Sequence, residues 1–531
     1  MLDAIQLELI WRRLISLTEE AATTLLRTSF SSVVRESNDF ACVLMDAEGR
    51  SLAQPANSIP SFIGTVPRTV RGFLKQFPHE TLSEGDILIT NDVWLGTGHL
   101  PDITVAKPIF LNGNIVAFAG SVTHAPDIGG RIRSADAREV YEEGFQIPMM
   151  KVVEAGRMNR TFESLLRQNV RTPDQTVGDL YAQFSALHLM EVRLISLLKE
   201  WELRSFSEVS QQIRGRTEAA MRRAISAIPD GVYHATAVSD GFENSIVLRM
   251  ALKVHGDEIE VDYRGTDPQV QRSINVCAAY TTAYTAYGIK AVLTPDTPNN
   301  DGALEPLNIH APLGSILNSK PPAAGGARAL IGHFLPAMVL RALSQVVPER
   351  VISDVGSPLW CVNLAGVKED GKTFANLFFL NGGYGASAAS DGASVLSWPS
   401  NISSTPVEVL ERTAPIRICH RRIRSRTAGS GRFTGGAGQE FLFENLNKGP
   451  TIISFMAERT KPEAVANGLA GGDPGAAGEI QINTVRVDPK IQHTIDFGAR
   501  VLLRTPGAGG FGVPIRAQEA LAEADGAKDF V

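Results

Sequence analysis

The sequence predicts an α+β protein built from several domains, and three observations support this fold class. First, its 531 residues exceed the size of one compact domain, so roughly two to four packed units are expected. Second, residues 4–29 carry apolar side chains at helical spacing, whereas residues 39–54 and 103–124 have the pattern of paired strands. Third, short strand patterns separated by glycine-rich turns dominate the last third of the chain.

The elements are expected in the following order. A long amphipathic helix over residues 4–29 buries one face. Two strand pairs follow, one around the turn AEGR and one around LNGN, whose Asn-Gly pair is a strong hairpin signal. Helical spacing returns near residue 160 and ends at IPDGVYH, because proline and glycine stop a helix. Residues 231–320 are then expected to be β-rich, with a hairpin around HGD.

The second half of the chain continues with a buried helix in ARALIGHFLPAMVLRALSQVVP and short strands to about residue 515. The stretch AQEALAEADGAKDF near the end is typical of a surface helix. These patterns predict four parts: an N-terminal α+β domain with a metal site (1–155), a helical segment (156–229), a β-rich domain with a buried helix (230–345), and a glycine-rich β domain with a tail (346–531).

Composition excludes several classes of protein. The chain is 44% hydrophobic and 20% charged, with a net charge of -6 and no acidic or basic block, which argues against nucleic acid or a membrane surface as a partner. The four cysteines show no C-x-x-C spacing, so we expect buried thiols rather than a disulfide framework or a thiolate zinc site. The N-terminus lacks the continuous apolar run of a signal peptide or a membrane span, so we expect a cytoplasmic protein.

Two His-x-x-Asp pairs stand close together in a chain with only ten histidines. GTGHLPDITV contains His99 and Asp102, and VTHAPDIGG contains His124 and Asp127. Both pairs lie at the open end of the second strand pair, where loops can fold over one spot. Imidazole and carboxylate ligands together suit Zn, Mn or Fe in the divalent state, and a catalytic site needs about three or four protein ligands. The alternative is that each histidine caps a strand or satisfies a buried carbonyl.

The turn of this hairpin decides whether the two pairs meet. A three-residue turn over residues 112–114 pairs Leu111 with Ile115 and places Asp102 opposite His124. A two-residue turn shifts the register by one and sends these two side chains to opposite faces. Whether the two pairs meet therefore depends on which turn forms.

Two further carboxylates lie near strand patterns. Asp39 stands at the entry to the first strand pair and is either a ligand or a strand-edge aspartate. Asp92, in ITNDVW, is either a ligand or a turn-forming residue, and we favour the turn.

Eight motifs together resemble those of the hydantoinase B/5-oxoprolinase family, which includes β subunits of ATP-dependent hydantoinases and caprolactamase and related ketone carboxylase subunits. In chain order they are RESNDF, NDVWLGTGHLPDITVAKPIF, THAPDIGG, YEEGFQIP, DYRGTDPQV, PNNDGALEP, GSGRFTGGAG and TPGAGGFG. The resemblance runs from about residue 4 to residue 514. One departure lies near the expected site, where residues 131–133 read Arg-Ile-Arg and the family often has Pro-Gly-Ser.

The resemblance implies a subunit that works with a separate hydantoinase A-type partner, in a hetero-oligomer such as α2β2. The partner binds ATP and phosphorylates the carbonyl oxygen of a small cyclic amide or a ketone, and the B-type subunit receives the activated species at a divalent metal centre. For this chain we expect hydrolysis of a cyclic amide and a zinc ion, with manganese or iron as alternatives. The family's metal ligands fall on Asp39, His99, Asp102 and His124. Asp127, three residues after a ligand, is expected to take a proton from water or to orient His124.

Other motifs bear on this expectation. Arg131, Arg133 and Arg138 are candidates for phosphate recognition, because guanidinium groups match phosphate oxygens. The run RICHRRIRSR (residues 417–426) is a weaker candidate, since a solvated charged strand face is the simpler interpretation. The chain contains no G-x-x-x-x-G-K-[ST] motif, which agrees with ATP binding on a partner, and no G-x-S-x-G nucleophile motif.

Two other functions fit the same motifs. One is ATP-dependent carboxylation of a ketone, which uses the same activation with carbon dioxide in place of hydroxide. The other is a non-catalytic scaffold that only holds the ATP-using subunit.

Overall fold

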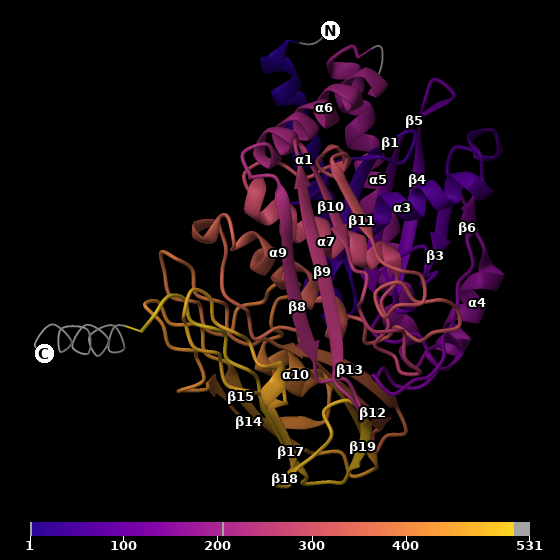
Figure 1. The fold of residues 1–531 in the computed structure, drawn as a ribbon. Coiled ribbons are helices and arrows are strands. Elements are labelled where there is room, and N and C mark those ends of the chain that lie inside the picture. The colour runs from indigo at the N-terminus through magenta and orange to yellow at the C-terminus, as the bar shows by residue number, and fades with distance from the viewer. Residues whose placement is uncertain (1–2, 204–205, 515–531) are drawn as a thin grey trace, which may run out of the picture.

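The computed structural model describes residues 3–203 and 206–514, so the surface helix expected over residues 517–530 lies outside the described residues. The described chain forms helices and four β-sheets (Figure 1), which confirms the α+β class. Within this part of the chain, no helix is both long and apolar enough to cross a bilayer.

The first sheet has seven antiparallel strands in the order β2-β1-β5-β4-β3-β6-β7. Helices α1 (Ala4–Thr28) and α5 (Pro173–Glu200) pack on one face, and α3 (Pro60–Gln76) packs on the other. Strand β1 is therefore buried along its whole length, with alternate side chains directed to the two helix layers. The strands are β1 (Phe40–Asp46), β2 (Ser51–Ala53), β3 (Ile87–Thr90), β4 (Asp102–Leu111), β5 (Asn114–His124), β6 (Met150–Glu154) and β7 (Arg157–Met158).

The β4–β5 hairpin reaches the expected register by a different route. Its turn has two residues, with Asn112 and Gly113 both at positive φ, and Leu111 pairs with Asn114 rather than Ile115. The two-residue alternative is therefore the one that forms. A β-bulge after Ile109 adds one residue to β5 and restores the register, so Asp102 still pairs with His124.

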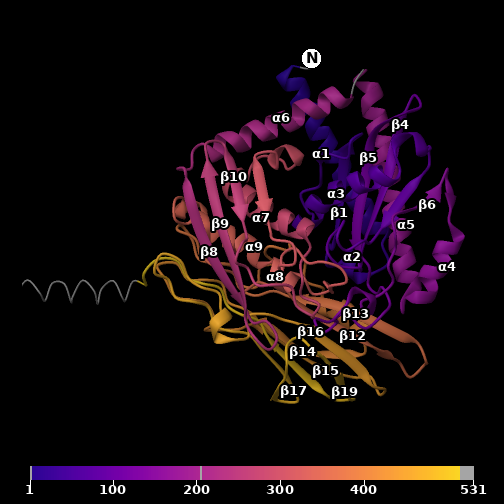
Figure 2. The same cartoon turned by 45° about the vertical axis from the view of Figure 1, so that its right-hand side comes forward.

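The second layer is built from the helices α7 (Ala278–Leu293), α8 (Ala329–Gly332) and α9 (Phe334–Leu343), and a four-stranded sheet in the order β11-β10-β9-β8. The hairpin around HGD and the buried helix after residue 327 are confirmed. Figure 2 shows α9 and α7 between this sheet and the first one. The strands are β8 (Gly231–Ser239), β9 (Ile246–His255), β10 (Glu258–Asp262) and β11 (Leu307–His310).

Helix α7 corrects the expectation that residues 231–320 are only β-rich. Its sequence, AAYTTAYTAYGIKAVL, is rich in aromatic and β-branched residues, which favour strands. It is also buried on nearly all sides, so it lacks the polar stripe that marks an amphipathic helix. Helix α3 was not predicted either, and Gly64 and Pro67 in its interior explain why.

Helices α4 (Arg160–Asn169), α5 and α6 (Phe206–Ile225) form the expected helical segment, and short helices complete the described chain. These are α2 (Ser32–Arg35), α10 (Val407–Thr413), η1 (His79–Thr81), η2 (Val140–Glu142), η3 (Asp301–Ala303), η4 (Pro348–Arg350) and η5 (Pro462–Ala464).

The C-terminal part is a β-sandwich of two sheets with strand orders β13-β12-β16-β19 and β14-β15-β20-β17-β18, packed around their own aromatic core. Glycines in its loops allow backbones to touch, since a Cβ on Gly383 would lie 1.8 Å from the carbonyl oxygen of Gly436. The strands are β12 (Trp360–Val367), β13 (Thr373–Leu380), β14 (Ile416–Ile423), β15 (Gln439–Asn445), β16 (Thr451–Met456), β17 (Glu479–Ile482), β18 (Val485–Arg486), β19 (Gln492–Ile495) and β20 (Arg500–Arg504).

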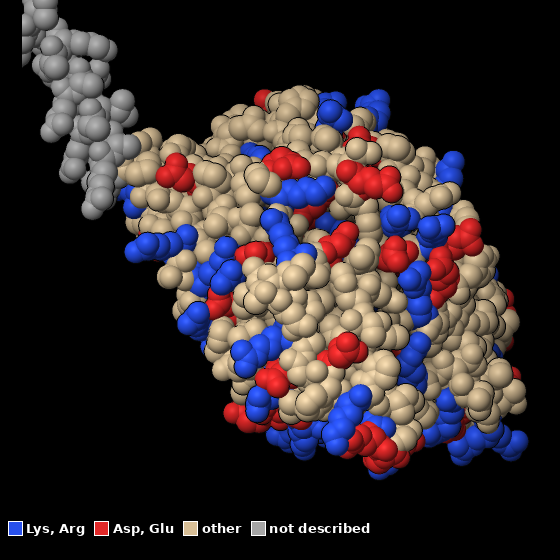
Figure 3. All heavy atoms as spheres, turned by 90° about the horizontal axis from the view of Figure 1, so that it is seen from below, with Lys and Arg blue, Asp and Glu red and all other residues tan. Residues whose placement is uncertain are grey.

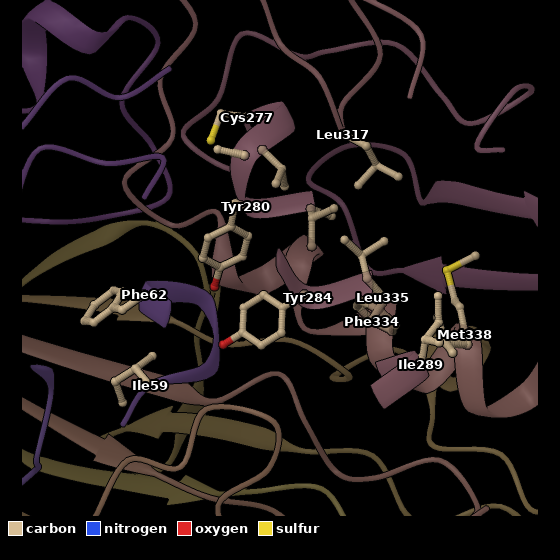
Figure 4. Close-up of a cluster of buried hydrophobic side chains, with 14 of the residues drawn as sticks. Ile59, Phe62, Cys277, Tyr280, Tyr284, Ile289, Leu317, Phe334, Leu335 and Met338 are labelled. Atoms are coloured by element: carbon tan, nitrogen blue, oxygen red, sulfur yellow. The ribbon is translucent and has the colours of Figure 1, made fainter. Parts of the chain in front are cut away.

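The largest hydrophobic core runs through all three layers. It joins α3, α7 and α9 to the second sheet, and it reaches the sandwich through Cys361, Phe379 and Met456. Figure 4 shows part of this core, in which α7 contributes Tyr280 and Tyr284. The sandwich therefore closes over the helical layer from below.

Candidate metal centre

The four expected ligands converge at one end of three adjacent strands. Asp39 directly precedes β1, Asp102 begins β4 and His124 ends β5, while His99 lies in the turn before β4. Because β5 lies between β1 and β4, both aspartates are neighbours of His124. The backbone nitrogen of His124 donates to the carbonyl oxygen of Asp39 at 3.1 Å, which fixes this approach.

Asp102 is the centre of the cluster. Its Oδ1 lies 2.7 Å from His99 Nε2 and accepts a hydrogen bond of 2.8 Å from His124 Nδ1. His99, Asp102 and His124 offer ligand atoms that all lie within 4.8 Å of one another. Asp39 stands slightly apart, with its Oδ2 at 3.9 Å from His124 Nδ1. All four residues are buried, so their polar atoms depend on one another rather than on water.

One atom of the cluster lacks a partner. His99 Nε2 is buried and makes no hydrogen bond, because its contact with Asp102 Oδ1 has the distance but not the angle of one. Arg328 Nη1 lies 2.7 Å from His99 Nδ1 and can only donate, so Nδ1 accepts and the ring proton of neutral His99 is on Nε2, beside the Asp102 carboxylate. A divalent cation that replaced this proton would have an imidazole nitrogen and a carboxylate oxygen as ligands, so the donor set fits a metal of the zinc, manganese or iron type.

Burial changes the protonation of these groups in the metal-free protein. Burial and the neighbouring charge of Asp102 raise the pKa of Asp39 to about 8. Burial lowers the pKa of His124 to about 4 and that of His99 well below its ordinary value. Burial also opposes ionisation of Asp102, but His99, Arg328 and the hydrogen bonds outweigh it and hold its pKa well below the usual range. At neutral pH, Asp39 is therefore protonated, Asp102 is charged and both histidines are neutral.

Arg328 is a member of the site that sequence reasoning missed. Its Nη2 donates to Asp102 Oδ2 at 2.8 Å, and its Nη1 lies 2.7 Å from His99 Nδ1. Asp102 Oδ2 also accepts a 2.6 Å hydrogen bond from Thr97 Oγ1. Arg328 lies 226 residues after Asp102 and just before α8, and no local motif connects the two.

Only one of the three candidate phosphate-binding arginines reaches the cluster. Arg133 Nη1 lies 3.5 Å from His124 Nε2, and its Nε donates to the Gly326 carbonyl oxygen at 2.9 Å. Arg131 instead pairs with acidic residues of its own loop, and Arg138 is exposed.

Asp127 lies outside the metal cluster. Its Oδ1 accepts a 2.7 Å bond from Arg171 Nη1, and its Oδ2 accepts bonds from the backbone nitrogens of Arg171 at 2.5 Å and Gly129 at 3.3 Å. It thus ties the loop after His124 to the segment before α5.

Asp92 and the arginine-rich run on β14 have structural roles, as the simpler interpretation of each predicted. Asp92 Oδ1 accepts from the backbone nitrogens of Trp94 and Leu95, which confirms the turn. On β14, Arg417 and Arg422 pair across the sheet with Glu444 and Glu440, as a charged strand face does. Seen from below, the surface of the molecule shows interspersed positive and negative side chains (Figure 3). Three cysteines are buried as expected, but the fourth, on β14, is exposed.

Two small cavities of about 40 Å³ each lie beside the cluster. One contains all four expected ligands and is closed by Tyr280 and Tyr284 of α7 and by β12 and β13. The other contains Asp127 and the loop after His124. His124 and Arg133 line both cavities.

The comparisons with known proteins agree with this fold. A model of the Hydantoinase B/oxoprolinase family matches residues 3–514, so the chain belongs to this family. Among curated relatives, the putative B component of a D-/L-hydantoinase from Pseudomonas sp. (strain NS671) is 29% identical, with 97% of this chain and 90% of that protein aligned. The beta chain of caprolactamase from Pseudomonas jessenii is 28% identical, with 98% and 93% aligned. The Arabidopsis thaliana 5-oxoprolinase 1 is 29% identical, but the alignment spans only 42% of that longer protein.

Two solved structures share the fold. The ATP-dependent caprolactamase from Pseudomonas jessenii superposes with a TM-score of 0.87 at 26% identity, covering 98% of this chain and 93% of that one. Nucleotide-free acetone carboxylase superposes with a TM-score of 0.88 at 18% identity, covering 97% of this chain and 76% of that one.

Proposed function

We propose that this chain is the B-type component of an ATP-dependent cyclic amide hydrolase of the hydantoinase, lactamase or oxoprolinase type. In this proposal an A-type partner binds ATP and phosphorylates the carbonyl oxygen of the ring, and this chain hydrolyses the activated ring. The single observation that supports it best is the buried cluster of His99, Asp102 and His124, with an unpartnered His99 Nε2. The names of the hydantoinase and caprolactamase relatives give the reaction class.

The chemistry requires both activation and a nucleophile. An amide resists hydrolysis because its nitrogen donates into the carbonyl group and leaves poorly. Phosphorylation of the oxygen makes the carbon electrophilic, so attack by hydroxide becomes feasible. Asp39, His99, Asp102 and His124 would hold a divalent cation, which would supply that hydroxide at neutral pH by lowering the pKa of water to about 7.

The charges of the site suit a phosphorylated substrate. Two carboxylates, Asp39 and Asp102, balance the charge of a divalent cation, and Arg328 is held by Asp102 and His99, so the guanidinium group of Arg133 is the one available to face an anion. Arg133 lines both small cavities beside His124, so its guanidinium group is within reach of a substrate in either one. We assign Arg133 to the recognition of the phosphoryl group.

Asp127 has a positioning role in this proposal. Both of its oxygens are used by Arg171 and the backbone, so it is a poor acceptor for a proton from water. Its bonds instead hold the loop that follows His124, and with it the wall of the cavity that contains Arg133.

The test is co-expression of the chain with an A-type partner and a screen for ATP-dependent opening of hydantoin, oxoproline and lactam rings. The proposal predicts ring opening that needs ATP, both proteins and a divalent metal. A parallel screen of ketones with labelled bicarbonate covers the carboxylase alternative, and incorporation of label without ring opening would replace the hydrolase proposal. Full activity in a His99→Ala variant would instead favour a scaffold. His188→Ala, an exposed histidine on α5, is the matched control.

A further inference from the structure

A buried line of polar side chains leads away from the metal cluster into the helical layer. Tyr280 and Tyr284 lie one turn apart on α7, with ring centroids 4.8 Å apart, and Tyr284 Oη lies 3.2 Å from His333 Nε2. All three residues line the cavity that contains the four expected ligands. In Figure 4 the two hydroxyl groups lie on the sides of their rings that face the start of α3. The proposed function so far uses none of these groups.

The hydrogen bonds among His333, Tyr284 and Tyr280 all donate toward the metal cluster. The backbone nitrogen of Leu359 donates to His333 Nδ1 at 3.4 Å, so the ring proton of neutral His333 is on Nε2. Nε2 then donates to the Tyr284 oxygen, and the Tyr284 hydroxyl donates to the Tyr280 oxygen. The proton of Tyr280 remains free to be donated into the cavity beside the cluster.

Tyr280 is held in place and stays protonated. The guanidinium carbon of Arg328 lies 4.4 Å from the centroid of its ring. Burial raises the pKa of Tyr280 to about 12, although the nearby charge of Arg328 and the hydrogen bond from Tyr284 act in the opposite direction. The same positive charge and hydrogen bond stabilise the phenolate that forms when the proton is given away.

Ring opening needs such a proton. When water adds to the phosphorylated ring, the carbon carries a phosphate ester oxygen, a hydroxyl group and the ring nitrogen. If the bond between carbon and the phosphate ester oxygen breaks, phosphate leaves with the electron pair, the hydroxyl loses its proton, and the intact amide returns. ATP is then consumed without a product. Phosphate is the better leaving group, so productive cleavage requires a proton on the nitrogen.

We propose that Tyr280 donates this proton to the ring nitrogen, and that Tyr284 and His333 position its hydroxyl group. This proposal rests on the proposed function. As the proton reaches nitrogen, the bond between carbon and nitrogen breaks with its electron pair going to nitrogen. The hydroxyl group on the carbon returns a proton to the Tyr280 phenolate and becomes a carbonyl group. The product is a ring-opened acyl phosphate with a free amine, and a second water hydrolyses it to carboxylate and phosphate.

Other groups of the cavity are poorer donors. Arg133 and Arg328 do not release protons in proteins, and both cluster histidines are neutral. The Cys361 thiol also lines the cavity, with its pKa raised to about 11 by burial, so it is the competing candidate.

The test compares Tyr280→Phe with the native chain, each assembled with the A-type partner. The variant keeps the ring beneath Arg328 and removes only the oxygen. Ring opening should fall about 100-fold. Substrate-dependent ATP hydrolysis should persist, so ATP consumed per ring opened should rise at least about tenfold. In water labelled with oxygen-18, the recovered substrate should gain the label in its carbonyl group, because the futile route replaces that oxygen.

Controls make the result specific. Tyr287→Phe removes a hydroxyl on the next turn of α7 that lines a different cavity, so it should keep native coupling. Imide substrates, whose nitrogen leaves more easily, should be opened by Tyr280→Phe with a smaller loss than lactams. If Tyr280→Phe fails to fold, Tyr284→Phe should show weaker uncoupling in the same direction.

The outcomes separate the two proposals. A native complex that opens no cyclic amide would refute the proposed function, and the role of Tyr280 with it. A native complex that opens rings while Tyr280→Phe keeps native coupling, with unlabelled recovered substrate, would refute the role of Tyr280 alone. Uncoupling in Cys361→Ala but not in Tyr280→Phe would assign the proton to the thiol.

Discussion

Metal binding by this chain should release one proton, and the proton should come from Asp39. In the metal-free protein, the pKa of Asp39 is raised to about 8, whereas that of His124 is lowered to about 4 and that of His99 lies lower than its ordinary value. Between pH 5 and 8, Asp39 is therefore the ligand that must lose a proton before it can bind a cation. The affinity should rise about tenfold per pH unit over this range, or about 1.4 kcal/mol, and level off above pH 8.

Calorimetric titration of the metal-free chain with Zn²⁺ or Mn²⁺ measures this proton directly. Titrations at pH 6.5 in two buffers with different ionisation enthalpies should give about one proton released per ion bound. The same experiment at pH 9 should give nearly none. Asp39→Asn should bind more weakly and release no proton at either pH. Equal proton release by the native chain and Asp39→Asn would refute the assignment of Asp39 as the titrating ligand.

Three further predictions concern stability and binding. The metal-free chain should lose stability as pH rises from about 4 to about 8, because the fold keeps the Asp39 proton that the unfolded chain releases; denaturant titrations should show this slope, and Asp39→Asn should lack it. Asp127→Ala should cost about 1–3 kcal/mol of unfolding free energy, since it removes the carboxylate that pairs with the Arg171 guanidinium and accepts from the Arg171 backbone nitrogen, whereas the exposed Asp174→Ala should cost less than about 0.5 kcal/mol in the same denaturant assay. Arg133→Met should lower kcat/KM about tenfold to 100-fold while metal content, measured by elemental analysis, stays unchanged.

The N-terminal half of the fold could be predicted because its patterns are local. The helix that became α1 shows an apolar stripe and begins at a capping box formed by Asp3 and Gln6. Asn112 and Gly113 identify the hairpin turn. The compensating bulge after Ile109 has no sequence signal, so the sequence could not show that a two-residue turn still places Asp102 opposite His124. Helix α7 was missed because a helix buried on all sides has no polar face to reveal its period.

The candidate site also contains some residues that the sequence predicts and others that it does not. The candidate ligands His99, Asp102 and His124 lie within 26 residues of one another on one hairpin, so their spacing and the strand pattern predict that they meet. Arg328 and Tyr280 come from segments that only tertiary packing brings to the cluster. Sequence spacing therefore indicates where the ligands meet, while the charged and hydroxyl groups around them require the three-dimensional structure.

The metal content of the purified chain tests the central claim most directly. Elemental analysis of the native protein should find about one divalent ion of the zinc, manganese or iron type per chain, and His99→Ala and Asp102→Asn should lose it while His188→Ala retains it. A native complex that opens cyclic amides at full rate with no stoichiometric metal, or a His99→Ala variant that keeps both its ion and its activity, would contradict the account.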